Sequence, residues 1–573
     1  MQDYLLSILI FLPLLAALVI TFMPGQYAAQ FKKIALGVSV IQTLIAAWVY
    51  FKFQDLAGVT DAGTFQFVER TSWINLNLGS LGRLSAEYFI GVDGLSITMV
   101  LLSTVILLIA VISAWNTQDR AKGFFSLLLI LNASIIGCFV ALDFLLFYLF
   151  FEFMLLPMYF LIGLWGGPRR EYASIKFFLY TLLGSIFILI VMIALNLSTI
   201  DPVKTAVELH LVEAVENVTP GIITEVQNML SQGQVLDSQM VHTFNLVSMT
   251  DAKNLIPGSI LDLGVAKIIF GYPARFVAFL LIFIGFAIKI PVVPVHTWLP
   301  DAHVEAPTSI SVILAGVLLK VGAYGLLRTG ILIFPEGALN YAWLIGLLGV
   351  ISILYGAMNA LASKDLKRLI AYSSVSHMGF VLLGFAAITA EGLGGSIYQM
   401  VSHGIISAGL FLIAGVIYDR THNRMIENYS GLAHVMPKYT VVVVIFFFAS
   451  LGLPGFSGFI AEIFVLLGAF SSIVISKWLM VLASFGLVLS AGYYLWTIQR
   501  MFYGKFHLKG DIDKSVLVDM NRREWIMFIP LIVLAALLGI FPHFILDLIN
   551  ASVETASGFI FETGLENLKT IQK

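Results

Sequence analysis

The chain has 573 residues, of which 59% are hydrophobic and 12% are charged. This apolar content exceeds what a water-soluble globule buries, so we expect most of the chain to be surrounded by lipid. The formal net charge of −2 provides no general basic field, which argues against nucleic-acid binding. The single cysteine, Cys138, excludes disulfides within the chain and cysteine-ligated iron–sulfur or zinc clusters.

Apolar windows long enough to cross the membrane recur along the whole chain. Crossing roughly 30 Å of hydrocarbon takes about 20 mostly apolar residues. We count fourteen such windows, near residues 4–23, 33–53, 89–115, 124–141, 143–165, 177–198, 275–292, 309–329, 341–362, 369–389, 392–417, 439–470, 476–500 and 525–548. The first window has neither a basic leader nor a small-residue cleavage site, so we expect a retained helix rather than a signal peptide. The expected fold is an all-α integral membrane protein.

Lysine and arginine are concentrated in the loops that follow odd-numbered helices. These loops contain Lys32, Lys33, Arg120, Lys122, Arg169, Arg170, Lys176, Lys364, Lys367, Arg368, Arg420, Arg424, Lys438, Arg500, Lys505, Lys509, Lys514, Arg522 and Arg523. The positive-inside rule then predicts that both termini lie outside. The long polar insert at 199–274 is expected outside as well, as a peripheral cap.

Two of the windows contain helix breakers at matching positions. Helix 7 is interrupted by Pro291 and Pro294, and helix 12 by LGLPGFSGF at 451–459. If helices 4–8 and 9–13 are two five-helix units, both breaks fall on the fourth member, and the odd unit length makes the copies point in opposite directions. Interrupted helices in inverted repeats line the ion path of many transporters.

These repeats divide the chain into four parts. Residues 1–123 carry helices 1–3, 124–329 form the first repeat with its insert, and 341–500 form the second repeat. Residues 501–573 contain a cytoplasmic loop, helix 14 and an external tail.

Six ionisable side chains lie inside six different apolar windows. They are Glu152, Lys289, Lys320, His377, His403 and Glu462, on helices 5, 7, 8, 10, 11 and 12. Each charge at bilayer depth costs about 2.5–3.5 kcal/mol on insertion scales, so such groups usually mark a path for ions or protons. Carboxylate, ammonium and imidazole groups change their proton affinity widely with desolvation and with the presence of a partner. We therefore expect proton translocation through these residues.

A structural interpretation remains open for each of these residues. A lone histidine on a helix is often a hydrogen-bonded packing group, and a buried glutamate or lysine can be half of a structural ion pair. His296, Asp301, His303 and Glu305 stand at a helix end, where capping competes with chemistry. Lys364, Lys367 and Arg368 are most simply explained as topology charges.

Three strings carry a resemblance to a known family. They are IKIPVVPVHTWLPDAHVEAPTSISVILAGVLLKVGAYGLLR at 288–328, SKDLKRLIAYSSVSHMGF at 363–380 and LPGFSGFIAE at 453–462. They closely resemble the antiporter-like subunits of respiratory complex I, subunit M above all. In the related L and N subunits, and in multi-subunit sodium/proton antiporters, the ionisable group on the second broken helix is usually lysine, whereas it is Glu462 here.

The resemblance implies a role for each ionisable residue. Glu152 matches the partner of the helix 7 lysine, Lys289, and Lys320 matches the lysine that connects to the central axis. His377 and His403 match bridging positions, and Glu462 matches the terminal group near the outward exit. When Glu152 withdraws from Lys289, the unpartnered ammonium becomes costly and its proton is driven toward Lys320.

The resemblance also implies partners and cofactors outside this chain. It predicts a proton-pumping subunit of NADH-quinone oxidoreductase that carries no electron-transfer centre, with NADH, FMN, iron–sulfur clusters and quinone in partner subunits. The expected neighbours are L- and N-type subunits in a bacterial inner membrane, although a mitochondrial or thylakoid equivalent stays open. A multi-subunit cation/proton antiporter and a membrane-bound hydrogenase or formate-oxidising complex are the alternatives. The sequence does not decide the electron donor, the type of quinone or whether the transported ion is H⁺ or Na⁺. It also leaves open the pumping stoichiometry and the role of the insert.

Overall fold

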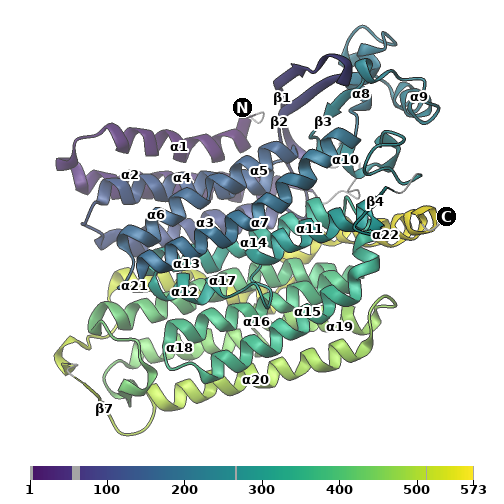
Figure 1. Cartoon of the computed structure of the whole chain (residues 1–573). Coiled ribbons are helices and arrows are strands. Elements are labelled where there is room, and N and C mark those ends of the chain that lie inside the picture. Colours follow the sequence, from purple (N-terminus) through teal and green to yellow (C-terminus); the bar gives the residue numbers. More distant parts are fainter. Residues whose placement is uncertain (1–3, 55–64, 265–266, 511–512, 572–573) are drawn as a thin grey trace.

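The computed structural model describes residues 4–54, 65–264, 267–510 and 513–571. Within these residues, 13 helices are long and apolar enough to cross a membrane, which confirms the predicted all-α membrane fold. Figure 1 shows long helices packed side by side, with the chain's two ends toward the end of the bundle that carries β1 and β2. We call this end the insert end and the opposite end the basic end. The uninterrupted spanning helices are α1 (Leu5–Phe22), α2 (Ala28–Lys52), α3 (Ile97–Ser113), α4 (Ala121–Val140), α7 (Arg170–Ser198), α15 (Pro335–Ala362), α16 (Leu366–Ala387), α17 (Ala390–Thr421), α20 (Lys477–Phe502) and α21 (Arg522–Ile540).

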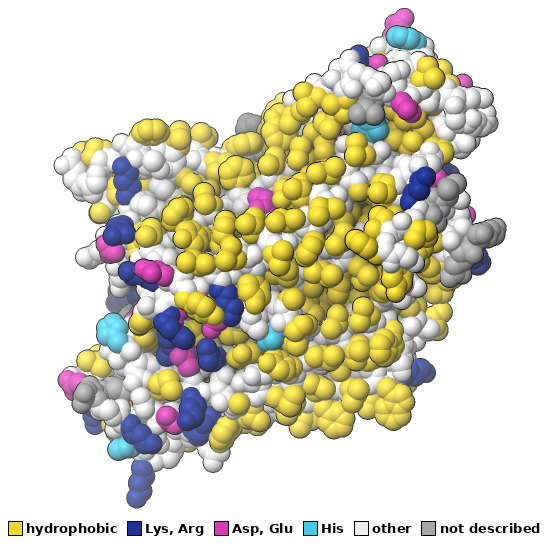
Figure 2. All heavy atoms as spheres, in the orientation of Figure 1, with side chains coloured by type: hydrophobic (Ala, Val, Ile, Leu, Met, Phe, Trp, Pro, Cys, Tyr) yellow, Lys and Arg dark blue, Asp and Glu magenta, His cyan; other side chains and the backbone are white. Residues whose placement is uncertain are grey.

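Lysine and arginine side chains gather at the basic end. Figure 2 shows them as dark blue spheres around that end, beside a broad hydrophobic flank. The loops that the sequence marked as basic therefore lie on one side of the bundle. A broad apolar flank with lysine and arginine gathered mainly at one end is typical of a protein that spans a bilayer.

The two predicted interruptions are present. The first crossing is made of α11 (Ala274–Lys289) and α12 (Trp298–Glu305), and the second of α18 (Pro437–Ser450) and α19 (Ser457–Ser471). Each is the fourth crossing of its unit, because α5 (Phe144–Phe153) and α6 (Leu155–Trp165) together make one crossing. The sequence window for helix 7 ended at residue 292, whereas α12 completes that crossing at the basic end.

The eighth crossing contains two π-helical turns that the sequence did not indicate. It runs through α13 (Thr308–Ile313), η9 (Leu314–Leu318), α14 (Leu319–Gly325) and η10 (Leu326–Ile331), where η9 and η10 are π-helical. A π-turn widens the helix and leaves carbonyl groups out of the regular ladder, and such turns are frequent at functional sites.

The predicted start of the third crossing is wrong by several residues. Residues 89–92 belong to the strand β2 (Arg83–Val92), which pairs antiparallel with β1 (Gln66–Asn77), and α3 begins only at Ile97. Asp93 ends the strand: its carboxylate accepts a hydrogen bond from Ser96 N and forms a buried ion pair with Arg328 at 2.5 Å. The strand is almost as apolar as the helix, so composition alone merges the two.

The insert forms a cap with its own small core at the insert end. It contains α8 (Pro202–Glu208), α9 (Pro220–Ser231), α10 (Leu246–Thr250) and the strand β3 (Val241–Thr243), which pairs parallel with β2. Its core residues are Ile200, Ala206, Val226, Leu230, Val235 and Met240. The remaining short strands are β4 (Ile268–Ile269), β5 (Tyr272–Pro273), β6 (Tyr429–Ser430) and β7 (His507–Leu508).

The last apolar window merges two helices. The helix α21 ends at Ile540, and after Pro542 a separate helix, α22 (His543–Ile571), begins. Asn567 of α22 donates a hydrogen bond to Glu336 in the first turn of α15, at 3.0 Å, and Gly564 packs against Pro335. At its start, α22 accepts a hydrogen bond from Tyr50 near the end of α2. Both of its ends therefore contact the insert end of the bundle, where the sequence predicted only an external tail.

A buried ion pair fixes the start of α11 against α15. Arg275 Nε lies 2.6 Å from Glu336 Oε1, and the other guanidinium nitrogens donate to backbone carbonyls. We expect Glu336→Ala to lower the free energy of unfolding by about 3–5 kcal/mol, because it leaves a buried guanidinium without its partner. Thermal unfolding of the purified protein in detergent measures this. The control is Glu208→Ala, whose partner Arg83 is half exposed and whose loss is expected to cost at most about 1 kcal/mol. Equal losses in the two variants would contradict the expectation.

Asp143, between α4 and α5 at the insert end, is predicted to make stability depend on pH. Burial raises the pKa of this carboxyl from about 3.8 to about 6, against the backbone hydrogen bonds from Glu87 and Leu146 that lower it. The folded state holds this proton more tightly than the unfolded state. The contribution of the protonated Asp143 to the free energy of unfolding is therefore fully present below pH 4 and is lost as pH rises through 6. The loss is about 3 kcal/mol at 1.36 kcal/mol per pH unit. Unfolding midpoints of Asp143→Asn between pH 4 and 7 should fall less with pH than those of the parent; parallel curves would refute this role.

Candidate functional site

Four of the six predicted residues form one continuous buried row. Lys320 Nζ on α14 lies 2.8 Å from His403 Nδ1 on α17. The rings of His403 and His377 on α16 are 5.5 Å apart between centroids. His377 Nε2 lies 3.5 Å from Glu462 Oε1 on α19. We call these four residues the polar row; it joins the first repeat to the second, and no member is more than 5% exposed.

The π-helical turn η9 shapes the Lys320 end of the row. Lys320 Nζ donates a hydrogen bond to the carbonyl oxygen of Ala315, five residues earlier, at 2.6 Å. The contact is available because η9 departs from the regular helical ladder just before Lys320. The ammonium therefore has two polar neighbours, a carbonyl and an imidazole, and no carboxylate in ion-pair contact among the described residues.

The second interruption shapes the other end of the row. Each ring nitrogen of His377 faces a backbone carbonyl oxygen, to which it can only donate: Nδ1 faces Ser373 O at 2.7 Å, and Nε2 faces the oxygen of Ser450, the last residue of α18, at 3.0 Å. Glu462 packs against Gly452, which has φ +78°. A Cβ at Gly452 would lie 2.5 Å from Glu462 Oε2, so glycine is needed there for both conformation and space. The break at 451–456 thus leaves the Ser450 carbonyl free to bind His377 and leaves space beside Gly452 for the Glu462 carboxylate.

Glu152 and Lys289 lie apart from the polar row and are not paired with each other. Lys289 ends α11 and is 1% exposed. Its Nζ faces the rings of Phe151 at 4.8 Å and Phe177 at 5.6 Å, and among the described residues it has no hydrogen-bond partner. Glu152 Oε1 also lacks one, and no ion pair within 4.0 Å joins the two side chains. The described contacts of this ammonium are therefore cation–π contacts with two rings, in place of an ion pair.

The end of α11 also contacts the helix that carries Lys320. A Cβ at Gly322 would lie 2.9 Å from Lys289 Cβ, so this glycine lets the lysine stem pass close to α14. The stem of Lys289 thus packs against α14 at Gly322, two residues after Lys320 in the sequence. The structure brings four of the predicted residues into one row and leaves Glu152 and Lys289 outside it, unpaired with each other.

Two histidines that the sequence left undecided have the environment of a functional group. His303 on α12 is fully buried, stacks on Phe411 at 4.2 Å and has no hydrogen-bond partner at either ring nitrogen among the described residues. His296, before α12, is 2% exposed and is likewise unpartnered at both nitrogens. Buried polar groups are normally hydrogen-bonded, so these two residues stand out. Sequence spacing carries no signal for such burial.

The acidic residues of α12 anchor it at the basic end. Asp301 pairs with Lys176 at 2.7 Å and with Arg368 at 3.4 Å. Glu305 accepts a hydrogen bond from Arg169 N at 2.9 Å. The contacts of Asp301 and Glu305 are therefore those of residues that hold a helix end in place.

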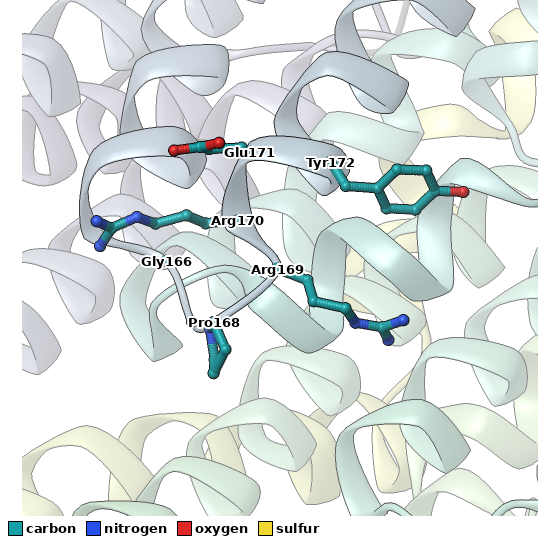
Figure 3. A pocket seen from close by; sticks show the side chains of 7 residues that line it. Gly166, Pro168, Arg169, Arg170, Glu171 and Tyr172 are labelled. Carbon is teal, nitrogen blue, oxygen red and sulfur yellow. The ribbon is translucent and has the colours of Figure 1, made fainter.

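A surface depression at the basic end is separate from the polar row. It has a volume of about 590 Å³ and is lined by residues 166–172, in the turn between α6 and α7. Figure 3 shows the side chains of Arg169 and Arg170 extending in opposite directions. Because its polar groups do not converge, the depression lacks the arrangement of a small-molecule site.

The fold and the site together define a class of protein: a multi-pass membrane protein in which two inverted units with interrupted helices enclose a row of buried ionisable side chains. The family model described as NADH:quinone oxidoreductase/Mrp antiporter matches residues 141–236 and 215–490. NADH-quinone oxidoreductase subunit M of Rhodobacter capsulatus is 39% identical over 550 residues, which cover 96% of this chain and 95% of the relative. The chain belongs to this family, and the predicted resemblance is confirmed.

Solved structures agree with this assignment. A chain of respiratory complex I from Thermus thermophilus with bound NADH matches with a TM-score of 0.74 and 27% identity, over 97% of this chain and 99% of that one. A chain of the Mrp complex from Dietzia sp. DQ12-45-1b has a TM-score of 0.71 at 20% identity, over 100% and 99% of the two chains, and shares the fold.

Proposed function

We propose that this chain is the subunit M type, proton-translocating subunit of an NADH-quinone oxidoreductase. The single observation that carries the proposal is the polar row, because it links the two interrupted-helix units through titratable groups in contact at membrane depth. Relatives that cover nearly the whole chain bear this name. Glu152, Lys289, Lys320, His377, His403 and Glu462 are the proposed proton-carrying residues.

Separation of Glu152 from Lys289 is the proposed driving step. An ammonium beside a carboxylate is stabilised in its charged form, whereas a desolvated ammonium without that partner gives up its proton more readily. The unpaired arrangement of these two side chains corresponds to the releasing state. Moving one charge against 100 mV takes about 2.3 kcal/mol, which is comparable with making or losing one partly buried ion pair.

The polar row then relays the proton toward Glu462. Lys320 as a free amine accepts a proton, and its hydrogen-bonded neighbour His403 passes it to His377 and Glu462. These groups bind H⁺ by nitrogen and carboxylate chemistry, whereas a sodium path needs several oxygen ligands around one point. The nitrogen-rich row therefore supports H⁺ as the transported ion.

The energy source in this proposal lies in partner subunits. We infer that this chain is a non-redox subunit and that NADH, flavin, iron–sulfur clusters and quinone react in other subunits of the complex. Its lateral neighbours would be L- and N-type subunits, and its location a bacterial inner membrane. The basic end would face the cytoplasm by the positive-inside rule, which puts both termini and the insert outside.

The test is purification of the native assembly with identification of its subunits. Flavin and iron–sulfur absorbance, NADH oxidation and acidification inside vesicles would support the proposal. A particle without flavin that exchanges cations for protons would instead support the alternative, a multi-subunit cation/proton antiporter. A redox particle that does not oxidise NADH would point to a hydrogenase-type or formate-oxidising complex.

A further inference from the structure

Lys367 occupies an unfavourable position for a charged group. It is 2% exposed, although the sequence suggested a topology charge at the surface. It lies in the first turn of α16, where the positive end of the helix dipole opposes a cation. Its neighbours Lys364 and Arg368 follow the simpler expectation, since Lys364 is exposed and Arg368 is 41% exposed. A buried lysine at a helix N-terminus needs a reason beyond topology.

The only hydrogen bond described for the Lys367 ammonium runs to the interrupted helix. Nζ donates to the carbonyl oxygen of Ala306, the residue that ends α12, at 2.8 Å. The charged groups that face Lys367 are Arg424, Asp365, Asp419 and Glu305. None of these carboxylates lies within 4.0 Å in an ion pair with it among the described residues. Lys367 thus shares with Lys289 and Lys320 the property of a buried ammonium without a paired carboxylate.

Buried polar groups lead from Lys367 toward Lys320. The Ala306 carbonyl that binds Lys367 also lies 3.5 Å from Ser311 Oγ, and this hydroxyl lies 3.2 Å from the carbonyl of His303. Ser311 stands one helical turn before Ala315, whose carbonyl binds Lys320. The ring of His303, unpartnered at both nitrogens, lies within electrostatic range of both lysines. His303 is thus a buried, unpartnered imidazole close to both ammonium groups, on the same short helix whose last carbonyl binds Lys367.

Water has access to the Lys367 region from the basic end. A cavity of about 480 Å³ opens there, and it is lined by Val304 of α12 and by the residues that flank Lys367, among them Asp365 and Arg368. Arg424, also in the lining, donates to the Val304 carbonyl at 2.8 Å. The cavity reaches the two elements that hold Lys367, α12 and the start of α16.

We propose that Lys367 is the residue through which protons are taken up from the basic end, and that His303 carries them from Lys367 to Lys320. This inference rests on the proposed function. The protonated ammonium of Lys367 gives its proton to a free ring nitrogen of His303, and His303 gives a proton to the amine of Lys320. Lys367 regains its proton from water in the cavity. Ser311 positions the path by bonding to both the Ala306 and His303 carbonyls.

The decisive variant is Lys367→Arg in the assembled complex. Arginine keeps the positive charge and can donate to Ala306 O, but it does not release its proton in proteins. A purely positioning role would survive this change, and proton uptake would not. NADH-driven electron transfer and acidification of vesicles are measured together. We expect Lys367→Arg to lose the same share of proton release per electron as Lys320→Met, while the exposed control Lys364→Arg matches the parent enzyme.

The outcomes distinguish failure of the proposed function from failure of the uptake role of Lys367. If Lys320→Met pumps normally, the proposed function itself fails. If Lys320→Met loses pumping and Lys367→Arg keeps it, the uptake role of Lys367 is wrong and the residue only positions α12. Should Lys367→Arg fail to assemble, His303→Gln decides, because it leaves the Lys367 contact intact and removes the carrier: loss of proton release supports the path, and full release overturns it.

Discussion

Lys289→Met is expected to reduce the proton translocation contributed by this chain at least about tenfold, while the complex still assembles. The methionine fills a similar volume between Phe151 and Phe177 but cannot carry a proton, so the driving step with Glu152 is lost. A tenfold loss corresponds to about 1.4 kcal/mol, less than the work of moving one charge against 100 mV. The measurement is NADH-driven acidification of vesicles that contain the assembled enzyme, normalised to electron transfer.

The matched control for this variant is Lys477→Met. Lys477 is exposed at the start of α20, at the insert end, and contacts the ring of Phe470. We expect it to leave pumping unchanged, because it makes the same chemical change outside the membrane interior. Undiminished proton release in Lys289→Met would remove Lys289 from the path.

Glu462→Gln is expected to have an effect of similar size at the opposite end of the polar row. Glutamine retains the shape that fits against Gly452, yet it cannot accept a proton from His377. Protons would then accumulate on the histidines, and release would fall at least about tenfold. Glu554→Gln on the exposed side of α22 is the isosteric control. The same vesicle assay measures both variants, and normal release by Glu462→Gln would mean that protons leave the row before α19.

The fold was predictable where hydrophobic length and chain breakers carry the information. Pro291, Pro294 and the glycines around 452–458 mark the two interruptions, because several breakers close together inside an apolar window disrupt the helical hydrogen bonds at that point. The hairpin ahead of α3 was missed since its strand β2 is nearly as apolar as a spanning helix. α22 was missed because its first residues continue the apolar window of α21.

The residues of the polar row were predictable for an energetic reason. Ionisable groups inside lipid are costly, so Lys320, His377, His403 and Glu462 are conspicuous against their apolar neighbours. Their order of contact was not predictable, because it depends on the π-turn η9 and on how α16, α17 and α19 pack.

Lys367 and His303 were harder to recognise for the opposite reason. Both stand in polar strings at the basic end, where charge is ordinary, and only the packing of α12 against α16 shows that they are buried. Sequence reports the type of a residue near the membrane surface but not its depth.

The most direct test of proton passage is a high-resolution experimental map of the assembled enzyme that resolves ordered water. A buried ammonium and a buried imidazole without protein partners require water for hydrogen bonding. We predict ordered waters at Lys289 Nζ, at the unpartnered Nε2 of His403 and at the ring nitrogens of His303, connected to the polar row. Dry apolar packing around these atoms, with Lys289 sealed off from Lys320, would contradict proton translocation along this path.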